Sequence, residues 1–351
     1  MATRMTLDEI SKKINVSRTT IYKVLNNKGF VSEKTTQKVR RSLEEYNYVP
    51  NYNARDLAKS KRYRIAYIGM RHLSAKYFSS LINKGLARAH TDFVDHGLEI
   101  LIEESDFENP QKQIRDIDKM RERGITNFII SPSDVFLLKD KIDELQKQKC
   151  NVILLSRYVD LPVKTYVGVN YYKSGMLAGE MLTKIMPSGG RIVIITNSSA
   201  KDDNTVRERY LGFMSWIEKF KQYEIVEVIE SVNTDELALQ TFDYMTEKYN
   251  DLNEIDAIYD ITYKLNIFAE KVHLLGKDQD IKLVGFDIYK ENAEYVGKAV
   301  IDIVIGQQLS EQAYDAARML FQKVCHGIDY AKKDYYSRLD VIVASNLDYF
   351  I

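Results

Sequence analysis

The chain has 351 residues, with 50 Lys and Arg against 50 Asp and Glu, so its formal net charge is zero. Overall neutrality argues against a nucleic-acid or membrane-surface partner, because such proteins usually carry a basic excess. The charge is unevenly distributed, however. Residues 1–62 hold fourteen Lys and Arg but six Asp and Glu, a net charge of +8, which leaves −8 on the remaining 289 residues. The sequence therefore predicts a basic N-terminal segment attached to an acidic body.

The length allows two or three domains at roughly 150 residues per domain. The two cysteines, Cys150 and Cys325, cannot form a disulfide framework and are typical of a reducing compartment. The N-terminus lacks the apolar segment of a signal peptide, and no apolar run approaches the roughly 18 residues of a membrane span. We therefore expect a cytoplasmic protein without a membrane partner.

The first 50 residues predict a small helical domain. Apolar residues recur at helical spacing over residues 5–46, in three short stretches. Between the first two, Asn15 tolerates the left-handed turn conformation and Ser17 is a good N-cap for the next helix. Two short helices joined by about three residues are a helix-turn-helix candidate. A solvated helical bundle with ordinary surface charge is the alternative on these grounds. In the helix-turn-helix interpretation, the outer face of the second helix carries Arg18, Thr19, Tyr22, Lys23 and Asn26, residue types that contact bases and phosphates in a major groove.

Residues 51–62 form a short polar and basic linker that can hold at most a two-turn hinge helix. Such a helix is marginal alone, because nucleation is costly.

From residue 63 onward, strand-length apolar runs alternate with longer amphipathic stretches, a pattern typical of parallel sheets with helices on both faces. About ten such units exceed one ordinary doubly wound sheet, so we expect an α/β body of two lobes. The predicted strands are 64–69, 98–102, 127–131, 151–155, 166–169, 191–195, 225–229, 256–259 and 281–286; the predicted helices include 76–96, 110–123, 173–185, 204–221 and 235–249.

The N-terminal segment closely resembles the DNA-binding headpiece of the LacI/GalR family of bacterial transcription regulators. The matching elements keep the order and spacing of the family, and they are Thr6-Leu7, Val16-Ser17, Val24-Leu25-Asn26, Val31-Ser32, Asn47-Tyr48-Val49-Pro50-Asn51 and Ala54-x-x-Leu57-Ala58. The resemblance implies a homodimer that binds a pseudo-palindromic operator in double-stranded DNA.

The resemblance also assigns roles to individual positions. Arg18, Thr19, Tyr22 and Lys23 would face bases, and Thr6, Thr20, Asn26 and Ser32 would contact or position phosphates. Asn51 and Ala54 belong to the matched hinge. Leu57 matches the hinge leucine that wedges into the minor groove and bends the site.

Two departures from the family put the operator sequence in doubt. Tyr22-Lys23 stands where the family commonly has Ser-Arg, and lysine is a point donor rather than a bidentate fork. Asn15 stands where the family prefers glycine.

The body, residues 63–351, resembles the two-lobed effector core of the same family, with the ribose-type periplasmic binding protein as its nearest pattern. We expect an N-lobe of residues 63–164 and 291–324 and a C-lobe of residues 165–290 and 325–351, each a type I periplasmic-binding-protein-like doubly wound sheet. The motifs are Lys76-Tyr77-Phe78, Asn109-Pro110, Arg123-Gly124, Ile129-Ile130-Ser131-Pro132-Ser133-Asp134, Val169-Asn170-Tyr171-Tyr172-Lys173-Ser174-Gly175, Arg207-x-Arg209-x-x-Gly212-Phe213 and Val284-Gly285-Phe286-Asp287.

A polar ligand in an interlobe cleft needs an aromatic face and groups that bond adjacent hydroxyls. The resemblance implies Tyr77 and Phe78 for stacking, and Arg157, Arg209 (or Arg207), Asp287 and Gln307 for polar contacts. Asp134 follows a strand that ends at the cleft mouth. Each of these also has an ordinary structural explanation as a core, turn or solvated helix residue.

Two positions depart from the sugar-binding pattern. Ser156 stands where sugar binders often have Asp, and Thr262-Tyr263 stands where Asn-Asp is common. An ordinary pentose or hexose is therefore in doubt, and the alternatives are a larger, more aromatic-lined ligand or no ligand.

We expect that the protein is not an enzyme and that it has neither a metal site nor a cofactor. The five histidines are scattered without metal-ligand spacing, and the sequence has neither a phosphate-cradling Gly-rich loop nor a Gly-x-Ser-x-Gly elbow. The sequence thus predicts a homodimeric, ligand-responsive transcriptional repressor with a small-molecule effector, a sugar or sugar derivative. The alternative is a solute-binding sensor of the sugar-binding-protein type, whose main role is ligand capture rather than operator control.

Overall fold

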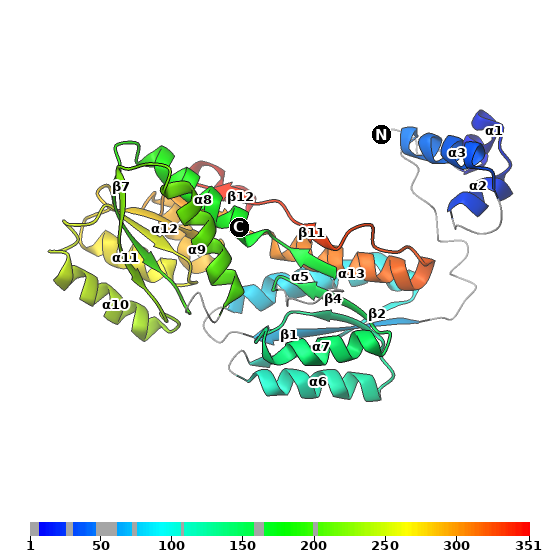
Figure 1. The fold of residues 1–351 in the computed structure, drawn as a ribbon, viewed down its shortest axis with the longest axis horizontal. Helices are drawn as coiled ribbons and strands as arrows, with labels where there is room; N and C mark the ends of the chain where they lie inside the picture. Colours follow the sequence, from blue (N-terminus) through cyan, green and yellow to red (C-terminus); the bar gives the residue numbers. More distant parts are fainter. Residues whose placement is uncertain are drawn as a thin grey trace.

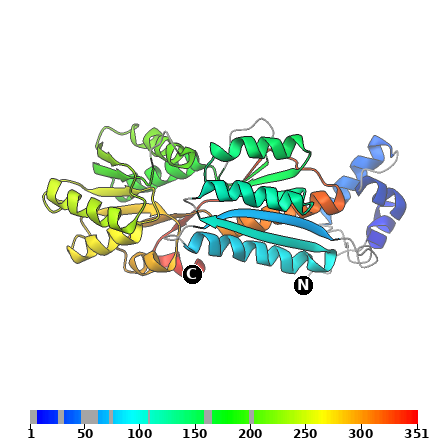
Figure 2. The same ribbon diagram turned by 90° about the horizontal axis from the view of Figure 1, so that it is seen from below.

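The computed structural model describes residues 7–25, 31–46, 62–71, 76–106, 109–157, 165–198 and 203–351. These form a small helical headpiece and a body of two lobes that lie end to end (Figures 1 and 2). The predicted helical headpiece and two-lobed α/β body are confirmed, since each lobe contains a six-stranded sheet with helices on both faces. The predicted hinge helix lies outside the described residues.

The headpiece consists of three helices, α1 (Leu7–Ile14), α2 (Arg18–Leu25) and α3 (Glu33–Glu45). They are held together by one small apolar cluster that takes residues from every helix. Its buried members are Ile10, Ile14, Ile21, Val24 and Val39. The predicted helical periodicity of this segment is therefore confirmed.

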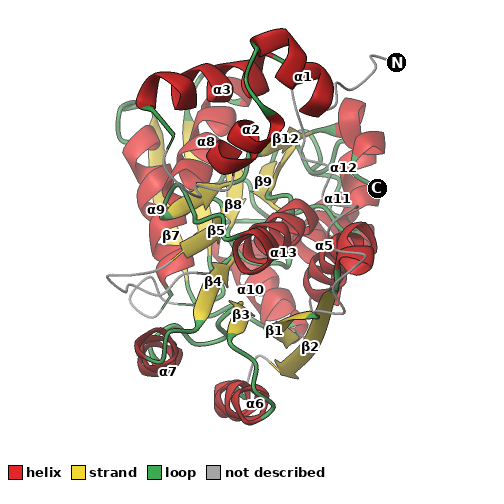
Figure 3. Ribbon diagram, turned by 90° about the vertical axis from the view of Figure 1, so that its right-hand side faces the viewer, coloured by secondary structure: helices red, strands yellow, loops and turns green. Residues whose placement is uncertain are grey.

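The N-lobe sheet has the strand order β11-β5-β4-β3-β1-β2, and all its neighbouring strands are parallel. Helices α5 and α13 cover one face of it, and α6 and α7 cover the other (Figure 3). The strands are β1 (Tyr63–Arg71), β2 (Leu98–Asp106), β3 (Asn127–Ile130), β4 (Asn151–Leu155), β5 (Thr165–Gly168) and β11 (Asp334–Tyr336). The helices are α5 (Lys76–Phe93), η1 (Val94–His96), α6 (Pro110–Glu122), α7 (Leu137–Lys147) and α13 (Leu309–His326).

The C-lobe sheet has the strand order β12-β10-β9-β8-β6-β7 and is parallel except for its edge strand β12. Helices α8 and α9 pack on one face, and α10, α11 and α12 on the other. The strands are β6 (Gly190–Ile195), β7 (Tyr223–Ile229), β8 (Ala257–Asp260), β9 (Lys282–Phe286), β10 (Ile303–Gly306) and β12 (Asp340–Ile342). The helices are α8 (Tyr171–Ile185), α9 (Asn204–Ile217), α10 (Asp235–Lys248), α11 (Leu265–Leu274), α12 (Lys290–Gly297) and η2 (Ala344–Tyr349).

The chain crosses between the lobes three times, after β5, after β10 and after β11. The predicted lobe boundaries were therefore wrong in three places. Residues 165–168 and 334–336 belong to the N-lobe, because β5 pairs with β4 and β11 pairs with β5. Residues 291–306 belong to the C-lobe, because β10 pairs with β9. A short apolar run shows that a strand forms, but backbone pairing decides which sheet it joins.

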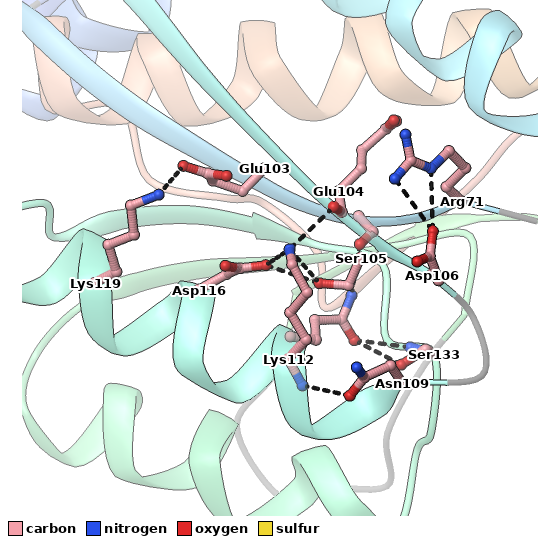
Figure 4. A network of polar contacts seen from close by, with 12 residues as sticks. Arg71, Glu103, Glu104, Ser105, Asp106, Asn109, Lys112, Asp116, Lys119 and Ser133 are labelled. Atoms are coloured by element: carbon pink, nitrogen blue, oxygen red, sulfur yellow. Dashed lines mark hydrogen bonds and ion pairs between the residues drawn. The ribbon is translucent and has the colours of Figure 1, made fainter.

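A polar network fixes the outer helix α6 to the strand ends of the N-lobe (Figure 4). The Lys112 ammonium donates to Asp116 at 2.8 Å, and it also reaches the carbonyl of Glu104 and the hydroxyl of Ser105. The buried Gln113 donates to the carbonyl of Gly69 in β1 and to that of Ser131 directly after β3, and it accepts from Ser133. The network ties α6 to β1, to β2 and to the segment that follows β3.

Helices α8 and α9 cross so closely that their backbones touch at two glycines. A Cβ on Gly175 would lie 1.9 Å from the carbonyl oxygen of Arg209, and a Cβ on Gly212 would lie 1.9 Å from that of Tyr172. Real Cβ atoms do not approach an oxygen this closely, so both positions require glycine. This contact sets the position of the first two turns of α9.

We predict that Gly175→Ala destabilises the chain by about 1–3 kcal/mol or more, because the added methyl forces α8 and α9 apart. Gly297→Ala is the matched control. Gly297 lies at the end of α12, where the nearest atom to an added Cβ is 3.6 Å away, so alanine there should be neutral or slightly stabilising. Urea unfolding of both variants measures the difference, and equal stabilities would contradict the close-packing account.

Candidate functional site

The headpiece has the local geometry predicted for its turn. Asn15 adopts the left-handed conformation at φ 50°, and the hydroxyl of Ser17 accepts a hydrogen bond from the Thr20 amide at 3.1 Å. Ser17 thus caps α2 as expected. In the same way, Ser32 accepts from the Thr35 amide at 3.3 Å and caps α3.

The two faces of α2 divide as predicted. Ile21 and Val24 are buried against α1 and α3, whereas Thr19 and Lys23 are exposed. Thr20 is half-buried, and its hydroxyl shares a hydrogen bond with Ser17. Arg18 and Tyr22 lie in α2 by their backbones, but their side chains are outside the described part of the structure. The other predicted DNA-contacting residues outside it are Thr6, Asn26, Asn51, Ala54 and Leu57.

A pocket of about 700 Å³, including its open mouth, lies between the two lobes. Its walls come from segments that follow the carboxyl ends of strands, where α/β sheets place ligands. The lining residues are Met70, Tyr77, Phe78 and Arg157 from the N-lobe, Tyr171, Asn197, Asp203, Thr205, Val206, Arg209, Ile261, Thr262, Tyr263 and Asp287 from the C-lobe, and Gln307 from the second crossing.

Arg209 is a buried cation that forms no ion pair with any of the described residues. Its side chain is on the second turn of α9, the residue is 6% exposed, and no described carboxylate lies within ion-pair distance of it. Its guanidinium carbon is 3.7 Å from the ring centroid of Phe286 and 5.2 Å from that of Tyr171. Its Nε has no hydrogen-bond acceptor. Buried donors are normally paired, so this guanidinium is suited to donate to an acceptor on a ligand in the pocket.

Asp287 supplies the acceptor side of the pocket. It adopts a left-handed backbone conformation directly after β9, at φ 61°. Both carboxylate oxygens accept from the amide of Gln307, at 2.8 and 2.7 Å. Burial raises the pKa of Asp287 above its ordinary value, while the Arg209 charge and the Gln307 bond act against that rise. Gln307 lies on the second crossing between the lobes, so its bond to Asp287 connects the pocket to that crossing.

Arg157 and Asp203 meet across the cleft. Arg157 follows β4 in the N-lobe, and its Nη2 donates to the Asp203 carboxylate at 2.7 Å. Burial raises the pKa of Asp203, but the Arg157 charge and the backbone amides of Thr205 and Val206 outweigh it, so the pKa lies below its ordinary value. Asp203 is therefore ionised near neutral pH.

The aromatic side of the pocket is partly occupied by the protein itself. The ring of Tyr77 stacks on that of Tyr289 with centroids 4.5 Å apart, which leaves one face of Tyr77 unavailable to a ligand. Phe78, Tyr171 and Tyr263 add apolar surface to the lining.

The structure brings six of the eight predicted effector residues together in this pocket: Tyr77, Phe78, Arg157, Arg209, Asp287 and Gln307. Two lie elsewhere. Asp134 accepts from the amides of Phe136 and Leu137 at the start of α7. Arg207 is on the outer side of α9 beside Glu208, with 40% of its side chain exposed.

Sequence reasoning missed several lining residues, of which Asp203 is the most consequential. Its position directly before the helix 204–217 is a recognisable N-cap signal. That signal does not reveal that its second carboxylate oxygen faces Arg157 from the other lobe. Ser156, in contrast, is buried and bonded to Gln312, and it does not line the pocket.

Comparison with known proteins assigns both parts of the chain. Residues 6–51 match the model for bacterial regulatory proteins of the lacI family, and residues 67–327 match that for the periplasmic binding protein domain. The chain belongs to the LacI family. Its headpiece is therefore the DNA-binding domain of a transcriptional regulator, and its body is the sugar-binding-protein-like core of that family.

Relatives of this LacI-family chain include regulators of sugar operons. It is 28% identical over 211 residues to the sucrose operon repressor of Streptococcus mutans, an alignment that covers 60% of this chain and 61% of the relative. It is 26% identical over 285 residues to the ribose operon repressor of Halalkalibacterium halodurans, which covers 80% of each chain.

Among solved structures, GanP, a glucose-galactose binding protein from Geobacillus stearothermophilus, has a TM-score of 0.71 at 21% identity. The match covers 82% of this chain and 99% of GanP, and it shows that the two share a fold.

Within the described ranges, no helix is both long and apolar enough to cross a membrane. In the same residues, no group of three or more His, Cys, Asp or Glu is arranged to hold a metal ion.

Directly before the lining residue Ile261, Asp260 is a fully buried carboxyl group. One oxygen accepts from the amide of Thr262 at 2.9 Å, and the other has no partner. Burial raises the pKa of Asp260 from 3.8 to about 6, although the Thr262 bonds and the charges of Arg209 and Lys264 lower it. Its folded-state pKa thus lies above its unfolded value.

We predict that Asp260→Asn stabilises the regulator at pH 8 but not at pH 4. A raised carboxyl pKa favours folding below pH 3.8, and this contribution is lost as pH rises through about 6. Since asparagine does not titrate, the variant should gain on the order of 2–3 kcal/mol relative to wild type between pH 4 and pH 8. Urea unfolding over this range measures the gain. Asp251→Asn, at an exposed turn residue, is the control, and a pH-independent difference for Asp260→Asn would contradict the account.

Proposed function

We propose that this LacI-family protein is a cytoplasmic, homodimeric repressor that binds a pseudo-palindromic operator and responds to a neutral, polyhydroxylated effector in the interlobe pocket. The observation that carries the effector part is the buried Arg209 guanidinium. It lacks an acceptor at Nε, and it shares the pocket lining with the Asp287 carboxylate.

These two groups suit a carbohydrate. A guanidinium is a donor without acceptor capacity, and an ionised carboxylate is an acceptor without donor capacity. A hydroxyl can accept from the first and donate to the second, and neighbouring hydroxyls can serve both. The rings of Phe78, Tyr171 and Tyr263 supply the apolar surface that the C–H face of such a ligand needs.

The charges of the lining favour a neutral ligand over a sugar phosphate. Among the residues that the structure describes, the charged side chains that line the pocket are Arg157, Arg209, Asp203 and Asp287, two cations and two anions. An anionic ligand would face both carboxylates in a confined site, where like charges repel strongly. The named functions of the sucrose and ribose operon repressors are consistent with a neutral sugar.

The distribution of charge supports operator binding by the headpiece. The +8 segment coincides with the headpiece and linker, and the −8 remainder with the body. A basic headpiece attracts phosphates, while an acidic body is repelled by them. DNA contact is thereby directed to the headpieces, whose α2 exposes Thr19 and Lys23.

We predict that Arg209→Met abolishes the effector response without unfolding the body. Methionine fills the space between Phe286 and Tyr171 and removes the cost of burying an unpaired cation, so the variant should be at least as stable as wild type. The control is Arg207→Met, two residues away on the exposed side of α9.

Thermal shift with a panel of pentoses, hexoses, inositols and disaccharides measures this response. A ligand at a hundredfold excess over its Kd stabilises wild type by about 2.7 kcal/mol. The shift should persist in Arg207→Met and disappear in Arg209→Met. An undiminished shift in Arg209→Met would remove Arg209 from the site, and no shift with any member in wild type would reject the neutral-carbohydrate proposal.

We further predict that Leu57→Ala keeps the fold and nonspecific DNA affinity but loses most preference for the operator. The family resemblance makes Leu57 the minor-groove wedge, and a wedge contributes through the bend that it imposes on one site. Titrations of wild type and variant against a selected operator and a scrambled duplex measure this preference at a fixed salt concentration. Unchanged discrimination would refute the wedge, and a chain that selects no operator from its source genome would favour the ligand-capture alternative.

A further inference from the structure

The Arg157–Asp203 pair joins the two lobes directly. Among the ion pairs of the residues that the structure describes, it is the one that crosses from one lobe to the other. Its side chains are only 11% and 13% exposed, so solvent screens the pair less than it screens a surface ion pair. Both residues line the effector pocket.

Each partner is anchored on its own lobe before it reaches across. Arg157 donates through Nη1 to the carbonyls of Pro132 and Ser133, which follow β3. Asp203 uses Oδ1 to cap α9, accepting from the amides of Thr205 at 2.7 Å and Val206 at 3.3 Å. Its other oxygen, Oδ2, accepts from Arg157. The pair therefore links two rigid elements rather than two mobile side chains.

The Tyr77–Tyr289 stack is a second contact between the lobes. Tyr77 lies on the first turn of α5 in the N-lobe, and Tyr289 precedes α12 in the C-lobe. The hydroxyl of Tyr289 is held by the carbonyl of Tyr263 and by Asn266, both at 3.1 Å. This contact and the ion pair consist of protein groups alone. They favour the closed arrangement of the lobes whether or not a ligand occupies the pocket.

We propose that Asp203 is a positioning residue of the effector site, whose ion pair with Arg157 is a latch that sets the equilibrium between closed and open lobes. The link from this equilibrium to operator binding rests on the proposed function; the latch itself does not. A neutral ligand leaves the pair intact and binds the closed body. A ligand with a carboxylate or phosphate would compete with Asp203 for Arg157 and open it.

One substitution distinguishes the two roles of Asp203, as a partner of Arg157 and as the cap of α9. Asp203→Asn keeps an oxygen that can accept from the Thr205 and Val206 amides but removes the charge that faces Arg157. Arg157→Gln removes the other partner and leaves the α9 cap untouched. Asp256→Asn is the matched control, because Asp256 pairs with Arg191 within the C-lobe and accepts from the Arg191 backbone amide.

The separation of the lobes is measured by double electron–electron resonance on the full chain without added small molecules. Spin labels are attached to cysteines that replace Lys147 on α7, with 77% of its side chain exposed, and Leu274 on α11, 71% exposed. Cys150→Ala and Cys325→Ser remove the native thiols, and dilution with unlabelled chains restricts the distances to one molecule.

We expect one dominant distance in wild type and in Asp256→Asn. Asp203→Asn and Arg157→Gln should each add a second population, with the closed-to-open ratio reduced by at least about tenfold. The double variant should open no further than either single one. Melting temperatures and circular dichroism establish that each variant is folded. Distance distributions that coincide with wild type in both folded single variants would overturn the latch. Because no ligand is present, this result is independent of whether the pocket binds a carbohydrate.

Discussion

The position of one guanidinium group, that of Arg209, determines most of what the body can do. The backbone of α9 is pressed against α8 at Gly175 and Gly212, which fixes the helix that carries Arg209. The rings of Phe286 and Tyr171 then hold the buried cation. A cation held in this way, away from water and without an ion pair, is costly unless something in the pocket accepts its hydrogen bonds. The pocket geometry is the consequence of that arrangement.

The pocket also occupies the place where lobe movement is controlled. Three crossings connect the lobes, and Gln307 on the second of them donates to Asp287. The ion pair between Arg157 and Asp203 joins the N-lobe to the C-lobe. A ligand that contacts Arg209 and Asp287 therefore contacts the C-lobe directly and, through Gln307, affects the second crossing between the lobes. This is the arrangement that coupling between an effector and a distant headpiece requires, since a ligand shifts an equilibrium only by its differential contacts with the two states.

The sequence predicted the secondary-structure elements well, but it predicted less well which lobe each strand belongs to. Alternating apolar runs located the main strands, and the turn at Asn15 and cap at Ser17 located the headpiece helices. The lobe boundaries were wrong because residues 165–168 and 303–306 carry no local signal of which sheet they join.

Within the site, the family motifs placed Arg209, Asp287 and Gln307 together but could not distinguish Arg209 from Arg207. Only the rotation of α9 makes that distinction. Asp203 was missed for a related reason. Its N-cap role is local, whereas its contact with Arg157 joins segments 46 residues apart.

We propose that the Arg209 pocket and the DNA-binding headpiece form one coupled system. The most direct test is the operator affinity of wild type and Arg209→Met, measured with and without a carbohydrate that stabilises wild type. We expect equal affinities for the two proteins without ligand. The ligand should then change the wild-type Kd by at least about fivefold and leave that of Arg209→Met unchanged. An equal response in both proteins, or none in wild type at saturating ligand, would contradict the account.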